Sequence, residues 1–157
     1  MQSIRKAQKK DISRVMELLG QVEMVHYRIR PDVFKYKVTK YTPEQLETLF
    51  EDAGKPVFVA VDEKDRVEGY AFCDIRVAQE HPLLQDGISV YIEDLCVDEL
   101  CRGKHLGTAL FEFVKDYAKR IGATSLTLNV WEGNDSALAF YEKQGMQVRS
   151  RIMEQKI

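Results

Sequence analysis

The stretch from Cys101 to Leu110, CRGKHLGTAL, combines glycines with basic side chains immediately before a segment of helical periodicity. The first backbone N–H groups of a helix have no partner within the helix, and the helix dipole adds partial positive charge there. Glycine lets an anion approach the main chain, and Arg102 and Lys104 add full charges. The turn could therefore bind a phosphate, although a solvated turn before a helix has the same local features.

The spacing of the glycines differs from two well-known phosphate motifs. A Walker loop has the pattern GxxxxGK[ST] and a dinucleotide-binding turn has GxGxxG, and neither occurs here. The turn instead resembles the cofactor signature of the GNAT-type N-acetyltransferases, Arg/Gln-x-x-Gly-x-Gly/Ala. It matches at Arg102 and Gly107 and departs at His105, where the signature has glycine. A second stretch, Asn134 to Met146, resembles the other signature of that family, Asn…Ala…Phe-Tyr-Glu-Lys-x-Gly-Phe.

The resemblance covers almost the whole chain and is strongest from Val90 to Met146. It implies that acetyl-CoA is the co-substrate, without a metal, and that amides of the turn bind its diphosphate. It also implies that the strand Tyr91–Val97 carries a bulge and diverges from the next strand, which leaves a slot for the pantetheine arm. The expected cofactor contacts are Leu95, Cys96, Val97, Arg102, Gly103, Lys104, His105, Leu106, Gly107, Thr108 and Asn134.

Two of these residues have open alternatives. If the position of His105 requires a positive φ, histidine costs ~1 kcal/mol relative to glycine. Its imidazole either points to solvent or lies beside a phosphate and strengthens binding when protonated. Asn134 either hydrogen-bonds the CoA arm or begins a helix, and the two roles are compatible.

Acetyl transfer to an amine requires removal of a proton from the amine, a donor to the oxyanion and an acid for the leaving thiolate. Two consecutive carboxylates, Glu93 and Asp94, are candidates for the first role, unless one of them faces solvent or pairs with a lysine. We favour Glu93 as the base, because this stretch also resembles that of polyamine acetyltransferases. The family position of Tyr141 implies the general acid, the alternative being a tyrosine that only packs on the sheet. Cys96 has no histidine near it in sequence, so we expect direct transfer without a covalent intermediate.

In the family, the connection between the first two helices walls the acceptor site, which corresponds here to Val25 to Tyr41. An ordinary helix connection is the alternative. The carboxylates suit a cationic amine, such as a polyamine, an aminoglycoside, an amino acid or a peptide amine. A catalytically idle acyl-CoA-binding or sensing module is the competing function. The expected substrate contacts are His26, Tyr27, Tyr36 and Tyr91.

Periodicity and turn signals predict the elements that position these residues. Asp11 is expected to N-cap the first helix, and Thr42 and Gln45 to form a capping box on the second. The order β-α-α-β-β-β-α-β-α-β predicts an α/β (α+β) fold with a mixed, mostly antiparallel sheet flanked by helices, as in the GNAT family. Strands are expected at Ser3–Ala7, Val57–Val61, Val67–Ala78, Ile88–Val97, Thr124–Trp131 and Val148–Ile157, and helices from Ile12, from Thr42 to about Asp52, at Leu106–Ile121 and at Asp135–Gln144.

The composition is that of an ordinary globular domain. The 157 residues predict one domain over residues 1–157, and a net charge of −2 argues against a nucleic-acid or membrane-surface protein. Three cysteines without a CxxC pair argue against a disulfide framework or a zinc site and fit a reducing compartment. Neither a signal peptide nor a membrane span is indicated, so we expect a cytoplasmic protein, with a homodimer as an open possibility.

Overall fold

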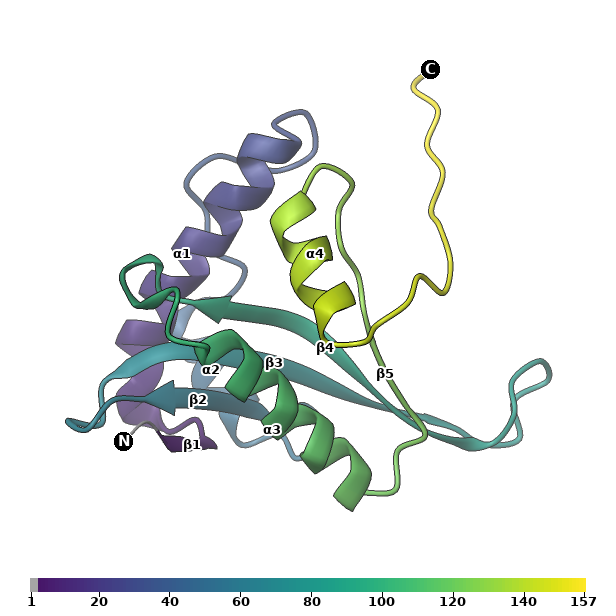
Figure 1. Cartoon of the computed structure of the whole chain (residues 1–157), viewed down its shortest axis with the longest axis horizontal. Helices are drawn as coiled ribbons and strands as arrows, with labels where there is room; N and C mark the ends of the chain where they lie inside the picture. Colours follow the sequence, from purple (N-terminus) through teal and green to yellow (C-terminus); the bar gives the residue numbers. More distant parts are fainter. Residues whose placement is uncertain (1–2) are drawn as a thin grey trace.

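The computed structural model describes residues 3–157, which form one mixed sheet between two layers of helices (Figure 1). The strand order is β1-β2-β3-β4-β5, and all neighbours are antiparallel except β4 and β5, which are parallel. The predicted mixed, mostly antiparallel sheet is therefore confirmed. The strands are β1 Ser3–Lys6, β2 Val57–Val61, β3 Val67–Ala78, β4 Gly87–Val97 and β5 Ser125–Leu128, and the α-helices are α1 Ile12–Ile29, α2 Pro43–Phe50, α3 Leu106–Arg120 and α4 Asp135–Lys143.

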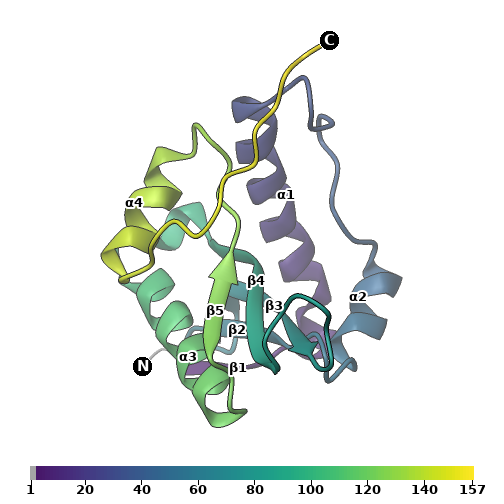
Figure 2. The ribbon, with the colours of Figure 1, turned by 90° about the vertical axis from the view of Figure 1, so that its right-hand side faces the viewer.

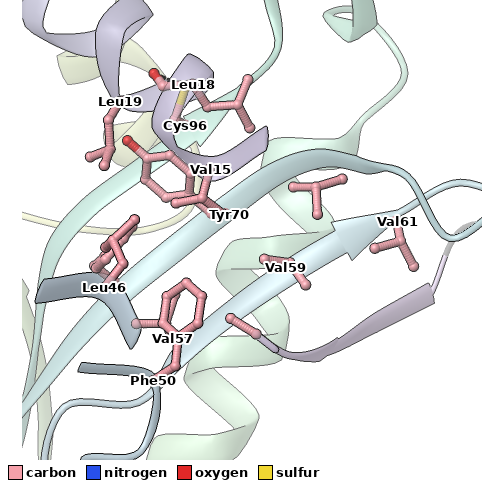
Figure 3. Close-up of a cluster of buried hydrophobic side chains, with 13 residues drawn as sticks. Val15, Leu18, Leu19, Leu46, Phe50, Val57, Val59, Val61, Tyr70 and Cys96 are labelled. Carbon is pink, nitrogen blue, oxygen red and sulfur yellow. Dashed lines mark hydrogen bonds between the residues drawn. The ribbon is translucent and has the colours of Figure 1, made fainter. Parts of the chain in front are cut away.

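Each face of the sheet buries its own core. Helices α1 and α2 cover one face, and α3 and α4 lie on the other (Figure 2). On the first face, Leu18 and Leu46 pack with Tyr70 of β3, as Figure 3 shows. On the second, Leu110 and Val114 of α3 are fully buried against the sheet. Strand β2 is buried along its whole length, as its uninterrupted apolar sequence predicts.

The ends of the first two helices test the capping predictions. The Thr42 hydroxyl accepts from the Gln45 amide at 3.2 Å, and the Gln45 side chain accepts from the Thr42 amide at 2.9 Å, so the capping box is confirmed. Asp11 occupies the N-cap position of α1 as predicted, but its carboxylate makes no cap hydrogen bond to this helix. The Asp11 carboxylate instead accepts from the Gln8 amide and pairs with Arg5, both at 2.8 Å, and so closes the 3-10 turn before α1.

The expected final strand over 148–157 is absent: this segment forms no regular structure and runs away from the sheet (Figures 1 and 2). Val148, Ile152 and Met153 are 62%, 89% and 87% exposed. Alternating apolar residues form a strand only when they pair with an edge, and within residues 3–157 this segment pairs with none: β5 is the last strand in the sheet order. Its tip is held instead near the end of α1, where Arg30 pairs with Glu154 at 2.8 Å.

Two further boundaries matter for the site. Strand β5 ends at Leu128 rather than at Trp131, and α1 continues to Ile29, so the segment Val25–Tyr41 is partly helical. Within residues 3–157, no helix combines the length and apolar character that crossing a membrane requires.

Candidate active site

Strand β4 carries a bulge at Glu93. Phe72 of β3 pairs with Asp94, whereas the next residue, Cys73, pairs with Ile92, so Glu93 is an extra residue on β4. Side chains alternate between the two faces of a regular strand, and one extra residue shifts that alternation. Glu93 and Asp94 consequently both face the α1–α2 side of the sheet. The bulge that the family resemblance implied is present, and it explains how consecutive carboxylates share one face.

Two donors from the connection between α1 and α2 hold the Glu93 carboxylate: the Lys40 ammonium and the Tyr41 hydroxyl. Burial by itself raises the pKa of Glu93, but the hydrogen bonds from Lys40 and Tyr41 outweigh burial and lower that pKa. Glu93 is therefore ionised at neutral pH with a cation beside it. The Lys40 ammonium lies where the ammonium of a cationic substrate could bind the same carboxylate.

Asp94 has a different environment. Its Oδ2 accepts a hydrogen bond of 2.9 Å from the hydroxyl of Tyr70, a residue buried in the core. Burial raises the pKa of Asp94 to about 6, and the hydrogen bond from Tyr70 limits the rise. A carboxyl group that titrates near neutral pH can both take and release a proton under physiological conditions. The two carboxylates thus differ: Glu93 is suited to holding a cation and Asp94 to exchanging a proton.

Strands β4 and β5 separate next to these carboxylates. They pair only from Ser89–Ile92 of β4 to Ser125–Leu128 of β5. Beyond Ile92, β4 continues to Val97, and within residues 3–157 no strand pairs with it on the β5 side. Main-chain groups of Leu95 and Val97 on that side can pair with an extended ligand in the manner of an added strand.

The glycine-bearing turn enters α3 through left-handed backbone. Gly103 has φ 81° and His105 has φ 58°, so the position where the signature has glycine does require a positive φ. The first amide of α3 with an intrahelical bond is that of Ala109, which donates to the His105 carbonyl at 3.0 Å. The amides of residues 106–108 are therefore available at the helix N-terminus, which suits an anion.

The start of this turn is fixed to α1 through Asp98, which is 4% exposed. Its carboxylate pairs with Arg14 and accepts from the Gln21 amide group at 3.3 Å and the Leu100 backbone N–H at 3.2 Å. Burial opposes ionisation of Asp98, but these donors lower its pKa below the usual value. The ion pair between Asp98 and Arg14 thus links the start of the turn before α3 to α1.

Gly107 serves packing rather than backbone freedom. A Cβ built on it would lie 3.4 Å from the Phe140 ring and 3.7 Å from Val97. A Cβ would thus be in ordinary van der Waals contact, and side-chain atoms beyond it would meet the Phe140 ring, so a small residue suits the approach of α3 to α4 and the end of β4.

Tyr141 of α4 packs beside Phe140 and Phe111, with ring centroids 5.1 Å and 6.2 Å away. Burial raises the pKa of Tyr141, and the nearby Asp94 and Cys96 add to the effect. The phenol is therefore protonated at neutral pH. Since no hydrogen bond joins its hydroxyl to another part of the described chain, the proton is available to a ligand.

Cys96 does not have the environment of a nucleophile. Its side chain is buried against α1, with Sγ 3.7 Å from the Leu18 carbonyl (Figure 3). Burial raises the pKa of the Cys96 thiol to about 12, so it stays protonated. This supports the expectation that no covalent intermediate forms on it.

The expected substrate contacts fall into two groups. Tyr91 lies on the same sheet face as Glu93, and the Arg76 guanidinium is 3.9 Å from the centre of its ring. His26 stacks on Phe34 at 5.1 Å, and Tyr27 contacts Tyr36 at 5.0 Å.

Within residues 3–157, no hydrogen bond joins Tyr27 or Tyr36 to the carboxylates of β4, whereas the charge of His26 lowers the pKa of Asp94. Asn134 caps α4, with Oδ1 accepting from the Ala137 amide at 3.3 Å. This is one of its two expected roles.

Sequence reasoning did not identify Lys40, Tyr41 and Tyr70 as the partners of the two carboxylates, although the alternative that one carboxylate pairs with a lysine is what Glu93 and Lys40 show. Tyr41 and Tyr70 are 52 and 24 residues from their partners in sequence. Tyr70 lies in an apolar strand and has the pattern of a core residue, so only the polar hydroxyl, which needs a partner when buried, could have identified it.

The left-handed backbone at His105 predicts a stability effect. We expect His105→Gly to raise the free energy of unfolding by ~1 kcal/mol, a shift of about 2–4 °C in Tm, because glycine adopts this conformation without a Cβ clash. Thermal unfolding followed by circular dichroism measures the change. His105→Ala is the matched control: it retains the Cβ and should not gain. Equal stabilisation of both variants would show that the backbone is not the cause.

Comparisons with known proteins found a matching family, relatives in sequence and similar solved structures. The model of the Acetyltransferase (GNAT) family matches residues 22–146. Glucosamine 6-phosphate N-acetyltransferase of Arabidopsis thaliana is 30% identical over 112 residues, which cover 69% of this chain and 73% of that protein. The solved structure of the Arabidopsis enzyme has a TM-score of 0.72 at 27% identity, covering 99% of this chain and 98% of that one.

Two other solved structures are similar. A mutant of the BH1408 protein of Bacillus halodurans has a TM-score of 0.94 at 32% identity, with 99% of each chain covered. An aminoglycoside acetyltransferase from an uncultured soil metagenomic sample, in complex with sisomicin, has a TM-score of 0.72 at 18% identity, covering 99% of this chain and 95% of that one. The last similarity shows a shared fold.

Proposed function

Because the chain belongs to the GNAT family of N-acetyltransferases, we propose that it transfers acetyl from acetyl-CoA directly to the primary amine of a small cationic molecule. We infer a cationic acceptor from the bulge on β4. The bulge directs the carboxylates of Glu93 and Asp94 to one face, beside the opening between β4 and β5. In this structure Glu93 already holds an ammonium, that of Lys40.

The residues around the opening fit acetyl-CoA. The free amides of residues 106–108 and the side chains of Arg102 and Lys104 would hold the diphosphate. Space around Gly103 is open, since a Cβ there would meet no atom within 4 Å. The unpaired side of β4 at Leu95 and Val97 would align the pantetheine arm, and Asn134 lies at the start of the helix that bears Tyr141.

The chain contributes four roles to the proposed transfer. Glu93 binds the ammonium of the acceptor in exchange for Lys40, and the carboxylate pair takes the proton that the amine must lose before it attacks the acetyl carbon. An amide at the bulge of β4 donates to the oxyanion that develops on the carbonyl oxygen. Tyr141 donates its proton to the sulfur as the carbon–sulfur bond breaks. Glu93, which lies beside the ammonium, remains our favoured base for the first step. Asp94, whose pKa is about 6, then accepts the proton from Glu93.

A screen of amines tests this function. Thiol release from acetyl-CoA is measured with a polyamine, an aminoglycoside, glucosamine 6-phosphate, lysine and a peptide with a free N-terminus. We expect turnover with at least one cationic small amine. Binding of acetyl-CoA by calorimetry without turnover on any amine would instead support an idle acyl-CoA-binding module.

The pKa of Asp94 predicts a pH dependence. Below about 6 Asp94 gains a proton and can no longer accept one, so kcat/KM for the acceptor should fall as the pH decreases through this value. Tyr70→Phe removes the hydrogen bond that lowers the pKa of Asp94, so the midpoint of the acid limb should move to higher pH.

The pH profiles of the wild type and of Tyr70→Phe are measured with the same acceptor, so that titration of the amine itself affects both profiles equally. The control is Tyr117→Phe, which removes a phenol that packs on Phe58 on the other face of the sheet. Identical acid limbs in wild type and Tyr70→Phe would remove Asp94 from the reaction.

A further inference from the structure

Lys40 occupies the place that the proposed function gives to the acceptor. Its ammonium pairs with the carboxylate of Glu93, the group proposed above to bind a cationic amine. The side chain of Lys40 is 40% exposed and that of Glu93 only 18%, so the lysine reaches the carboxylate from the solvent side. A primary amine of this chain therefore already lies where the primary amine of an acceptor would bind.

The segment around Lys40 keeps this amine within reach of the site. Residues 30–42 contain no helix or strand, and Lys40 itself is exposed. The next residue, Tyr41, holds the main chain in place, because its ring stacks on Phe72 of β3 at 5.7 Å and its hydroxyl donates to Glu93. Lysine has a flexible four-carbon stem, so its ammonium can leave and return while the main chain stays fixed.

We propose, on the basis of the proposed function, that the enzyme acetylates Lys40 of its own chain and that this modification opens the acceptor site. Lys40 gives one proton to Glu93, and its Nζ then forms a bond to the acetyl carbon while the carbon–sulfur bond breaks. Tyr141 donates its proton to the sulfur and regains the second proton that the nitrogen loses. The products are acetyl-lysine, the thiol of CoA and one proton on the carboxylate pair.

Acetylation changes what Glu93 can bind. An acetylated lysine has no charge, so the ion pair of Lys40 with Glu93 is lost. While the ion pair is present, an acceptor must displace Lys40, and its apparent affinity is reduced by the fraction of protein in which the site is occupied. Modification of Lys40 should therefore lower the KM for a cationic acceptor.

Mass spectrometry on the full chain, digested after incubation with acetyl-CoA and without an amine, tests the proposal. We expect an acetyl group on Lys40, formed at a rate that does not change with protein concentration, because the amine and the site belong to one chain. Excess CoA should slow this reaction by occupying the site. Lys64, an exposed lysine of the turn between β2 and β3, reports chemical acetylation, which CoA does not slow.

Two substitutions separate the charge of Lys40 from its modification. Lys40→Arg keeps a cation at Glu93 but cannot be acetylated, and Lys40→Gln has no charge. With the acceptor that the amine screen identifies, initial rates should give a KM ~5-fold lower for Lys40→Gln than for the wild type. Prior incubation with acetyl-CoA should bring the wild type to the value of Lys40→Gln and leave Lys40→Arg unchanged. The control Lys64→Gln should behave as the wild type.

A second readout needs no acetyl-CoA. Because the contact with Lys40 lowers the pKa of Glu93, titration of the Glu93 carboxyl by carbon NMR should give a higher pKa in Lys40→Gln than in Lys40→Arg. Tyr41 donates to the carboxylate in both variants. Equal pKa values would show that residue 40 does not occupy the carboxylate in solution and would overturn the proposal.

The failure of this inference can be told apart from the failure of the proposed function. An unmodified Lys40 in a protein that acetylates an amine overturns the inference alone. If neither Lys40 nor any amine is acetylated, the proposed function fails and the inference with it. Acetylation of Lys40 that excess CoA does not slow, or that speeds up with protein concentration, would contradict a reaction within the chain.

Discussion

Replacing Tyr141 by phenylalanine is expected to lower kcat by about 10²–10⁴-fold, the range typical of a lost acid–base catalyst. Burial and the neighbouring Asp94 raise the pKa of this phenol, so it keeps its proton until the thiolate leaves. The phenylalanine ring retains the contacts with Phe111 and Phe140, so the fold and the affinity for acetyl-CoA should be unchanged. Steady-state kinetics and calorimetry with CoA measure the two quantities.

The control for this variant is Tyr117→Phe, which removes a partly buried phenol from α3 on the same side of the sheet. It should have wild-type kcat. If Tyr141→Phe turns over at the wild-type rate, or if its loss is entirely a weaker affinity for CoA, Tyr141 is a packing residue and another group must protonate the sulfur.

Glu93→Gln is expected to lower kcat/KM for the acceptor by about 10²–10³-fold, since the change removes both a proton acceptor and the negative charge that holds a cation. The amide keeps the size of the carboxyl group and can still accept from Tyr41. The split between kcat and KM separates the roles: loss of the base lowers kcat, whereas loss of the anchor raises KM for the amine.

Glu47→Gln is a suitable control for Glu93→Gln. Glu47 is an exposed residue of α2 that pairs with Lys9 at 2.5 Å, away from the bulge. Its kinetics should be those of the wild type. Undiminished kcat/KM in Glu93→Gln would leave Asp94 as the sole carboxylate of the mechanism and would withdraw the preference for Glu93.

The sequence predicted the helices and strands well where the determining interactions are between residues close together in the chain. The capping box at Thr42 and Gln45 involves residues three apart and is present as predicted. Helix α3 has apolar residues on one face and begins at Leu106, directly after the turn, as expected. The element order and the mixed sheet followed from these patterns together with the family signatures.

Predictions failed where an element or a side chain depends on partners that are next to it in the folded structure. The alternating residues of 148–157 predicted a strand, but a strand needs a pairing partner, and in the part of the chain that the structure describes this segment pairs with no other strand. Asp11 has the right type and place for a helix cap, yet Arg5 and the Gln8 amide bind its carboxylate instead. Both errors arose from partners that the local sequence does not specify.

The candidate site shows the same division. Residue type and position indicated Glu93, Asp94 and Tyr141, and whether they are catalytic remains a prediction. The partners that make the two carboxylates different, Lys40 and Tyr41 for one and Tyr70 for the other, come from distant segments. Only the register of β3 on β4 showed that both carboxylates share a face.

The missing side chain at Gly107 has a consequence for altering cofactor preference. Phe140, which a Cβ there would meet at 3.4 Å, directly precedes Tyr141 in the sequence. Alanine would fit in ordinary van der Waals contact, but a larger residue at 107 would press on Phe140 of α4, next to the phenol of Tyr141, and on the amides proposed to bind the anion. The proposed recognition of the diphosphate and the proposed delivery of the proton would be mechanically joined at this point, so a large residue here would change both.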